Sequence, residues 1–180
     1  MIKQRVFTVV VIAFLLSACS GGAGEAGNPA VLAAEAYARQ DYFAARDRAL
    51  EALRSDPQDA TALDLLARVQ LAMGQGDNAL ATLDRLAASG TPAQPEDAAL
   101  LRAEAHLQRG NIDQARTLLD GQETAEAWRL RALIALQDGD AEAAAQAFAR
   151  GRTAPGERLK LFAAEASCLR QCPVMGSQPD

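Results

Sequence analysis

The feature that most constrains this sequence is a repeat with a period of roughly 34 residues. Four segments begin with a turn-forming residue at Gln40, Gly74, Gly110 and Gly139, and an alanine follows each of them five positions later. Three further columns lie seven positions before, three before and nine after these residues. They are Ala33, Ala67, Ala103 and Ala132, then Tyr37, Leu71, Leu107 and Leu136, and then Ala49, Leu83, Leu119 and Phe148. Columns that stay in phase predict a stack of similar units.

The composition indicates that each unit is helical. The chain is 49% hydrophobic but only 4% aromatic, and much of its apolar content is alanine, which is the strongest helix former. The β-branched residues cluster mainly in the first dozen positions, whereas Leu, Ala, Arg, Glu and Gln dominate the rest. We therefore expect an all-α protein.

The repeat resembles the tetratricopeptide repeat, a helix–turn–helix unit of about 34 residues. By this resemblance the glycine ends the first helix in a left-handed conformation, the alanines lie where helices cross, and Trp128 takes the large aromatic position of the fourth unit. The resemblance implies an α-solenoid, a right-handed superhelix of about four hairpins plus a C-terminal helix. An Ala-rich helical bundle with accidental spacing is the alternative.

The chain departs from the family pattern at three places. Gln40 stands where glycine is usual, Gly121 shortens the second helix of the third unit, and residues 89–95 form a longer connection than the family's tight turn. A ninth helix follows the hairpins as a cap or as the first half of a fifth hairpin, whose packing alanine would fall at Ala163. The helical pattern predicts helices at 29–39 and 42–55, 59–73 and 77–89, 96–109 and 112–120, 123–138 and 141–151, and 156–170.

The first 18 residues resemble a bacterial lipoprotein signal peptide. Lys3 and Arg5 precede an apolar run at residues 6–16, which at ~1.5 Å per residue is too short for a bilayer core of ~30 Å. Leu16-Ser17-Ala18-Cys19 then matches all four positions of the lipobox, which implies cleavage before Cys19 and lipidation of its thiol. An ordinary secretory signal with a chance cysteine is the alternative.

These features divide the chain into four parts. Residues 1–18 are the expected signal peptide, 19–28 a lipidated flexible tether, 29–171 the helical repeat domain and 172–180 a disordered tail. Ser20 follows the cysteine, whereas aspartate at that place retains lipoproteins at the inner membrane in well-studied Gram-negative systems. We therefore expect a lipid anchor in the outer membrane, facing the periplasm. Inner-membrane retention stays open, because the rule is not universal.

The net charge argues against nucleic-acid binding. The formal charge of the whole chain is −5, and loss of Lys3 and Arg5 with the leader gives −5 − 2 = −7. The remaining positive charges are scattered arginines that form no basic stripe. An acidic domain without a basic face is a poor partner for a polyanion.

The sequence contains no reactive constellation. It has no phosphate loop, nucleophile elbow or HExxH motif, and His106 is its one histidine. We therefore expect no enzymatic activity, no metal, no cofactor and no small-molecule substrate. Cys168 and Cys172 could form a disulfide in an oxidising compartment, but an i, i+4 pair within a helix suits a disulfide poorly. The disulfide-bonded and the reduced form of this cysteine pair both stay open.

The tetratricopeptide resemblance implies that a protein or peptide partner binds the concave face, which the first helices line. Helical phase places these polar and aromatic residues there: Tyr37, Asp64, Arg68, Glu104, Gln108, Arg129 and Gln137. We expect a membrane-anchored adaptor for an envelope assembly or secretion system, such as pilus assembly, outer-membrane protein assembly or exopolysaccharide export. A structural spacer or a scaffold for peptidoglycan enzymes, without a single tight ligand, is the alternative.

The lipobox makes a direct prediction about Cys19. Cys19→Ala should release the chain from membranes or block its processing, because no thiol remains to carry the acyl chains. Membrane fractionation and the mass of the N-terminal peptide measure this, and Cys168→Ala is the matched control that should stay on the membrane. Unchanged fractionation of Cys19→Ala, with no acyl mass on the wild-type peptide, would refute the anchor.

Overall fold

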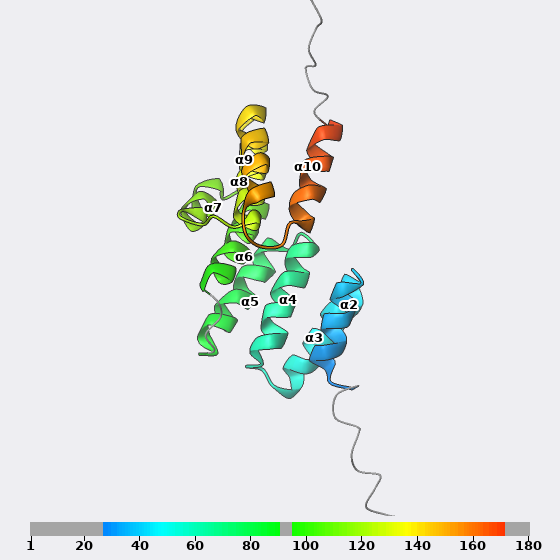
Figure 1. The fold of residues 1–180 in the computed structure, drawn as a ribbon. Helices are drawn as coiled ribbons and strands as arrows, with labels where there is room; N and C mark the ends of the chain where they lie inside the picture. The colour runs from blue at the N-terminus through cyan, green and yellow to red at the C-terminus, as the bar shows by residue number, and fades with distance from the viewer. Residues whose placement is uncertain (1–26, 91–94, 172–180) are drawn as a thin grey trace, which may run out of the picture.

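The computed structural model describes residues 27–90 and 95–171, and within them it places nine helices and no strand (Figure 1). The expected leader, most of the expected tether and the expected tail lie outside the described residues. None of the described helices is long and apolar enough to cross a membrane. The helices are α2 (Pro29–Ala38), α3 (Tyr42–Ser55), α4 (Ala60–Ala72), α5 (Gly76–Ala88), α6 (Pro95–Gln108), α7 (Ile112–Leu119), α8 (Ala125–Gln137), α9 (Ala141–Thr153) and α10 (Leu159–Gln171).

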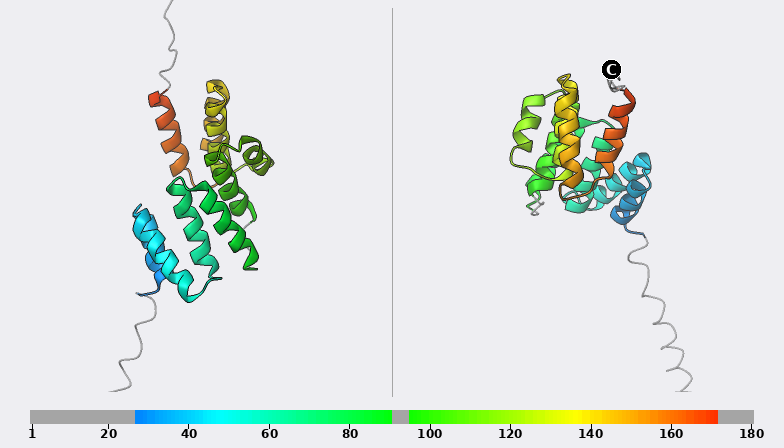
Figure 2. Two further views of the ribbon diagram at one scale, coloured as in Figure 1. Left: turned by 180° about the vertical axis from the view of Figure 1, so that it is seen from behind. Right: turned by 45° about the horizontal axis from the view of Figure 1, so that its top comes forward.

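The helices form a stack of four hairpins followed by a single helix. The hairpins pair α2 with α3, α4 with α5, α6 with α7 and α8 with α9. The first helices also contact one another in chain order, from α2 through α4, α6 and α8 to α10, so they share one side of the array (Figure 2). The contacts of α10 with α8 and α9 place it where the first helix of a fifth hairpin would lie. The predicted all-α solenoid is confirmed.

The predicted turn residues end the first helices in a left-handed conformation. The φ angles are +72° at Gly74, +77° at Gly110 and +78° at Gly139. Gln40 adopts the same conformation with φ +61°, and it is the one non-glycine residue with positive φ in the described part of the chain. A side chain raises the energy of this conformation. Gln40 adopts this conformation nevertheless, so the turn of the first hairpin has the same geometry as the turns of the other three.

Polar caps fix the start of several helices. The side chains of Asp41, Asp59, Thr124 and Asp140 each accept a hydrogen bond from a backbone N–H in the first turn that follows, which satisfies a donor that the helix itself cannot pair. The Thr124 cap starts α8 two residues later than the sequence pattern predicts. The last helix starts at Leu159 rather than at residue 156, because Gly156 has φ +102° and a right-handed helix requires a negative φ.

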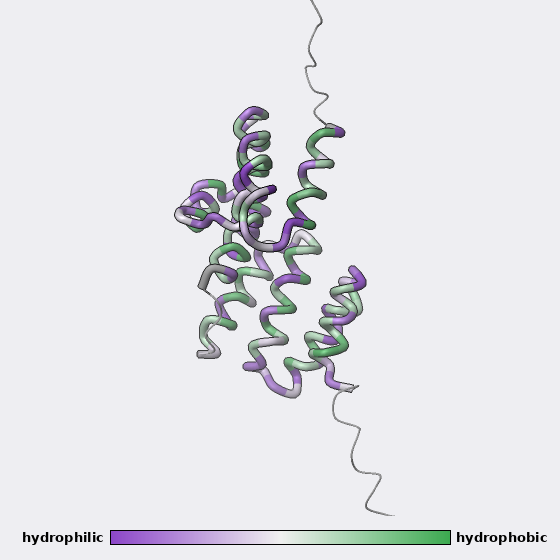
Figure 3. Tube along the Cα trace, viewed as in Figure 1, coloured by the Kyte–Doolittle hydropathy of each residue, from purple (hydrophilic) through white to green (hydrophobic). Residues whose placement is uncertain are grey.

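The alanine columns are buried contact points between helices. Ala33, Ala67, Ala103 and Ala132 are all 0% exposed, and the alanines five positions after each turn residue are at most 1% exposed. The large residues nine positions after the turns, such as Leu83 and Phe148, fill the core between hairpins. Figure 3 shows apolar and polar stretches interleaved along the helices, as expected when each helix buries one face. The predicted repeat register is confirmed.

Gly151 lets α10 pack closely against the fourth hairpin. A Cβ atom on Gly151 would lie 2.7 Å from Leu161 Cδ1 and 3.1 Å from Trp128 Cβ. Leu161 is 0% exposed and belongs to the same core cluster as Ala132 and Phe148. The absence of a side chain at residue 151 therefore makes room for the one fully buried leucine that we find on α10.

The contacts of α10 set the register of the fifth unit and correct one expectation. Four residues of α8 lie in or against the core cluster formed with α6 and α7, and three residues of α10 lie in or against the cluster formed with α8 and α9. Each of the α10 set lies 34 positions after its counterpart: Leu161 after Ala127, Ala164 after Leu130 and Cys168 after Ile134. The expectation that the packing-alanine position falls at Ala163 is wrong. By this register the position falls at Ala166, 34 positions after Ala132, and Ala166 is exposed on α10.

The alanine columns predict a large difference between two kinds of substitution. Ala67→Leu and Ala132→Leu should each lower the free energy of unfolding by roughly 1–3 kcal/mol, because added methylenes overpack a filled core. Gln137→Glu, at an exposed position of α8, should change it by less than about 0.5 kcal/mol. Thermal unfolding followed by circular dichroism measures both. Equal melting shifts for the two sets would show that the alanines are not packing sites.

Candidate protein-binding surface

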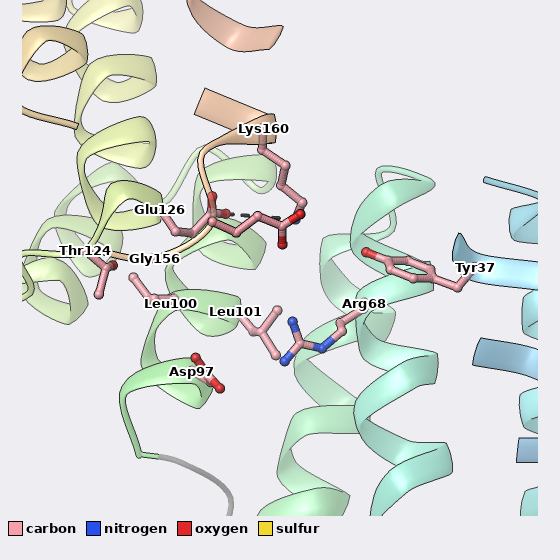
Figure 4. A pocket seen from close by; sticks show the side chains of 10 residues that line it. Tyr37, Arg68, Asp97, Leu100, Leu101, Thr124, Glu126, Gly156 and Lys160 are labelled. Atoms are coloured by element: carbon pink, nitrogen blue, oxygen red, sulfur yellow. Dashed lines mark ion pairs between the residues drawn. The ribbon is translucent and has the colours of Figure 1, made fainter. Parts of the chain in front are cut away.

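The first helices of the four hairpins and α10 line one hollow of about 250 Å³, which we call the first hollow (Figure 4). Tyr37 of α2, Arg68 of α4, Leu101 of α6, Glu126 of α8 and Lys160 of α10 all contribute to its wall. Its other lining residues are Asp97, Leu100, Thr124, Gly156 and Glu157. Residues far apart in the sequence meet here because the first helices stack on one side of the array.

A second hollow of about 500 Å³ lies between α6 and α8, further along the same two helices. Its wall combines leucines with polar side chains, and Gln108 Nε2 donates a 2.8 Å hydrogen bond to the Leu71 carbonyl oxygen of α4. The lining residues are Glu104, Leu107, Gln108, Leu133, Leu136 and Gln137. Both hollows lie along α6 and α8, and we call the surface that holds them the first-helix groove.

A buried ionic cluster separates the two hollows. Arg129 Nη2 lies 2.6 Å from Glu126 Oε1 and 3.1 Å from Glu104 Oε1. Arg129 is 7% exposed. Lys160 Nζ approaches the same two carboxylates, at 3.8 Å from Glu104 Oε2 and 3.9 Å from Glu126 Oε1. The cluster ties α6, α8 and α10 together, and its two carboxylates each face one of the hollows.

Within this cluster, Arg129 and Glu126 hold each other in the ionised form. Burial on its own lowers the pKa of Arg129, but the hydrogen bond from Arg129 to Glu126 and the charges of Glu104 and Glu126 outweigh burial and raise that pKa above its usual value. Burial likewise raises the pKa of Glu126, yet the hydrogen bond and charge of Arg129 hold it below its ordinary range. The groove therefore has a fixed, charged floor at neutral pH.

The burial of Arg129 corrects the sequence-based interpretation, which places it among exposed partner-binding residues. Its guanidinium is covered because Glu126, one turn earlier on α8, and Glu104, on the neighbouring α6, both draw it onto the helices. Helical phase predicts the face on which a residue lies, but it does not predict whether neighbouring side chains cover it. Arg129 supports the groove rather than offering a free charge to a partner.

The structure brings most of the other predicted residues to the groove. The Arg68 guanidinium is oriented by Asp64, whose Oδ2 accepts from Arg68 Nε at 2.7 Å. Burial raises the pKa of the Tyr37 hydroxyl above its usual value, although the nearby positive charge of Arg68 opposes this rise. Tyr37 and Arg68 line the first hollow, whereas Glu104, Gln108 and Gln137 line the second.

Four charged residues of the first hollow, Asp97, Glu126, Glu157 and Lys160, are absent from the sequence-based set. Two of them, Glu126 and Lys160, occupy the same place in their helices, because Lys160 lies 34 positions after Glu126. An alignment of the last helix on Ala166 rather than Ala163 would have placed Lys160 on this face. The wrong register of the fifth unit is therefore the reason that Lys160 is missing from the predicted lining of the first hollow.

Two further candidates from the sequence contribute no chemistry to the groove. His106 is half-buried on α6, and burial together with the charges of Arg109 and Arg102 lowers its pKa. Among residues 27–90 and 95–171, no group of three or more His, Cys, Asp and Glu side chains is placed to hold a metal ion. Cys168 packs in the core between α8, α9 and α10, whereas Cys172 lies outside the described residues. A disulfide between them stays a prediction.

The ionic cluster predicts a pH-dependent cost for the loss of Arg129. Arg129→Leu should destabilise the chain by about 3 kcal/mol at pH 7, because it leaves two half-buried carboxylates with only the more distant Lys160 as a partner. In the wild type, the lowered pKa of Glu126 gives stability that is lost as pH falls through that pKa. In the variant, the two carboxylates have lost Arg129 and protonate more readily, which relieves the penalty at low pH.

The difference in Tm between wild type and Arg129→Leu should therefore shrink between pH 7 and about pH 4. Arg129→Lys is the control, since it keeps the charge but loses the forked hydrogen bonds, and it should cost less than Arg129→Leu. A difference in Tm that is the same at both pH values would contradict this electrostatic account.

Comparisons with known proteins agree with this architecture. The tetratricopeptide-repeat family model matches residues 65–123 and residues 100–158, which together cover more than half of the chain. The crystal structure of a thermophilic TPR protein from Thermus thermophilus is similar to this structure with a TM-score of 0.59 and 23% sequence identity, over 82% of this chain and 92% of that one. No curated protein matches the sequence. The chain belongs to the tetratricopeptide-repeat family.

Proposed function

We propose that this chain is a lipid-anchored scaffold of the cell envelope, and that the first-helix groove binds a segment of another protein. Tetratricopeptide arrays present extended surfaces of stacked helices for binding. The observation that carries the proposal is the groove itself, in which two hollows lie along the first helices on either side of the ionic cluster around Arg129. Such a surface suits an extended or helical polypeptide segment.

The lining of the groove favours a polypeptide over a small molecule. The first hollow, at about 250 Å³, is smaller than the ~300–1,000 Å³ of a usual ligand pocket. The second hollow, at about 500 Å³, is within that range, but only two helices bound it, and its leucines alternate with Glu104, Gln108 and Gln137. An amphipathic segment could place an apolar side chain between these leucines and satisfy the polar rim with its own backbone.

Arg68 is the side chain that we expect to contact the partner most strongly. About a third of its side chain is exposed, and Asp64 orients its guanidinium toward the first hollow. Arginines that are held in place and partly desolvated are frequent energetic anchors of protein interfaces. The partner segment should therefore carry a carboxylate, or a C-terminal end, that reaches the first hollow.

The lipobox supports the location that we propose. Lipidation of Cys19 would place the start of α2 about ten residues from the membrane, because Pro29 is the first residue of that helix. A short tether keeps the repeat array close to the membrane surface but leaves its groove accessible. We propose the outer membrane, facing the periplasm, and a partner within an assembly or secretion system such as pilus, outer-membrane protein or exopolysaccharide export.

Photo-crosslinking from inside and outside the groove tests this proposal. A photoreactive phenylalanine at residue 137 faces the second hollow, and one at residue 54 is a matched control on the exposed side of α3. In the full chain, expressed in its own cells, we expect an adduct with a discrete protein from residue 137 and none from residue 54. Arg68→Glu should reduce the yield of this adduct by about tenfold, whereas Arg54→Glu should not change it.

Both arginine substitutions should leave the melting temperature nearly unchanged, since exposed or half-exposed ion pairs contribute only about 0–1 kcal/mol. Adducts of equal yield from residues 137 and 54 would place binding outside the groove. No adduct from either residue would instead favour a structural spacer without a tight ligand.

A further inference from the structure

Helix α10 carries an apolar stripe that no other described helix covers. Leu159 is 69% exposed, Phe162 47% and Leu169 58%, and Ala166 is also exposed. These residues follow one another at spacings of three and four, so they lie along one side of the helix. We call them the α10 stripe. Apolar stretches recur along this helix in Figure 3.

The stripe corresponds to the side of a first helix that its own second helix covers. The register of 34 positions places Phe162 after Trp128 and Ala166 after Ala132. In the fourth hairpin, Trp128 and Ala132 pack in one core cluster with Ala147 and Phe148 of α9, and Ala132 is 0% exposed. Among the described residues no second helix follows α10. The α10 stripe is therefore the surface against which a further helix would pack.

We propose that a second copy of this chain fills this place, with its own α10 packed antiparallel against the first. The first and second helices of a hairpin run antiparallel. A twofold axis perpendicular to α10 also makes two α10 helices antiparallel, so the second copy matches the direction of a covering helix. The contact would be isologous, because each copy would be both first helix and covering helix. The inference does not depend on the lipid anchor or on a partner in the first-helix groove.

The spacing of the stripe is complementary to itself about residue 164. With the axis at that height, Phe162 lies opposite Ala166 of the second copy, and Leu159 lies opposite Leu169 of the second copy. A large side chain then meets a small one twice near the centre, and leucine pairs close both ends. This is the alternation of large and small residues by which packed helices interdigitate.

The charges that flank the stripe predict how the pairing depends on salt. Lys160 and Glu165 already have partners within the chain, in Glu126 and Arg152 respectively. In the proposed pairing, Arg170 comes level with Arg158 of the second copy, so like charges face each other at both ends. Higher salt screens this repulsion. The dimer should therefore not weaken as salt is raised, in contrast to a contact that depends on ion pairs.

Cysteine cross-linking tests the pairing in the full chain. The parent protein carries Cys168→Ala and Cys172→Ala, and it sets the background from Cys19. To this parent we add either Ala166→Cys, on the stripe, or Ala81→Cys, an exposed alanine of α5 as matched control. Packed helices lie about 8–10 Å apart, so a short bismaleimide reaches across the proposed axis. We expect a cross-linked dimer from residue 166 and none from residue 81.

Three charge substitutions, two on the stripe and one outside it, separate the stripe from other apolar surfaces. Phe162→Glu should reduce the cross-linked fraction from residue 166 by at least about tenfold, because the change enters both halves of a twofold contact. Phe43→Glu, at a phenylalanine on α3 that is 67% exposed, should leave it unchanged. Leu169→Glu gives a second disruption further from the contacts of α10 with Trp128. Circular dichroism of each variant is the control that measures whether its helices are retained.

The expected outcome is a dimer that depends on residues 162 and 169 and persists from ~0.05 to ~0.5 M salt. Three results would each overturn the proposal. They are the absence of cross-linked dimer from residue 166, an equal yield from residue 81, and a yield that survives both Phe162→Glu and Leu169→Glu in folded protein.

Discussion

Close contact between helices at alanine residues is the constraint on which the rest of this structure depends. Ala67, Ala103 and Ala132 are each 0% exposed and occupy the same place in successive first helices. A larger side chain at any of them would separate two helices that are otherwise in contact, because protein interiors have no spare volume. The same contact, repeated, gives successive hairpins a similar offset. The common side lined by α2, α4, α6, α8 and α10 follows from that repetition.

The alignment of first helices has two consequences for the surface. It brings carboxylates and basic groups from α6, α8 and α10 within ion-pair distance. The burial of Arg129 is tolerated because two carboxylates lie beside its guanidinium. It also places Lys160 of α10 at the wall of the first hollow, while the opposite side of α10 stays uncovered. One helix thus completes the groove and presents a second apolar surface.

Much of the fold could be predicted from the sequence because the repeat fixes the phase of every helix. The turn glycines and the alanine columns each require a particular residue type, and both lie where the sequence places them. The side-chain environment of the groove was less predictable. The burial of Arg129 depends on Glu104, which lies 25 positions earlier on another helix. The register of α10 depends on contacts of Leu161 that no earlier spacing determines.

The central claim is that the first helices, rather than the second helices, form the binding surface of this array. Hydrogen–deuterium exchange of the full chain, alone and bound to the protein captured from residue 137, tests this claim most directly, because exchange reports on each helix separately. The account predicts added protection in α4, α6 and α8, with α3, α5, α7 and α9 unchanged. Added protection confined to α3, α5, α7 and α9 would contradict it.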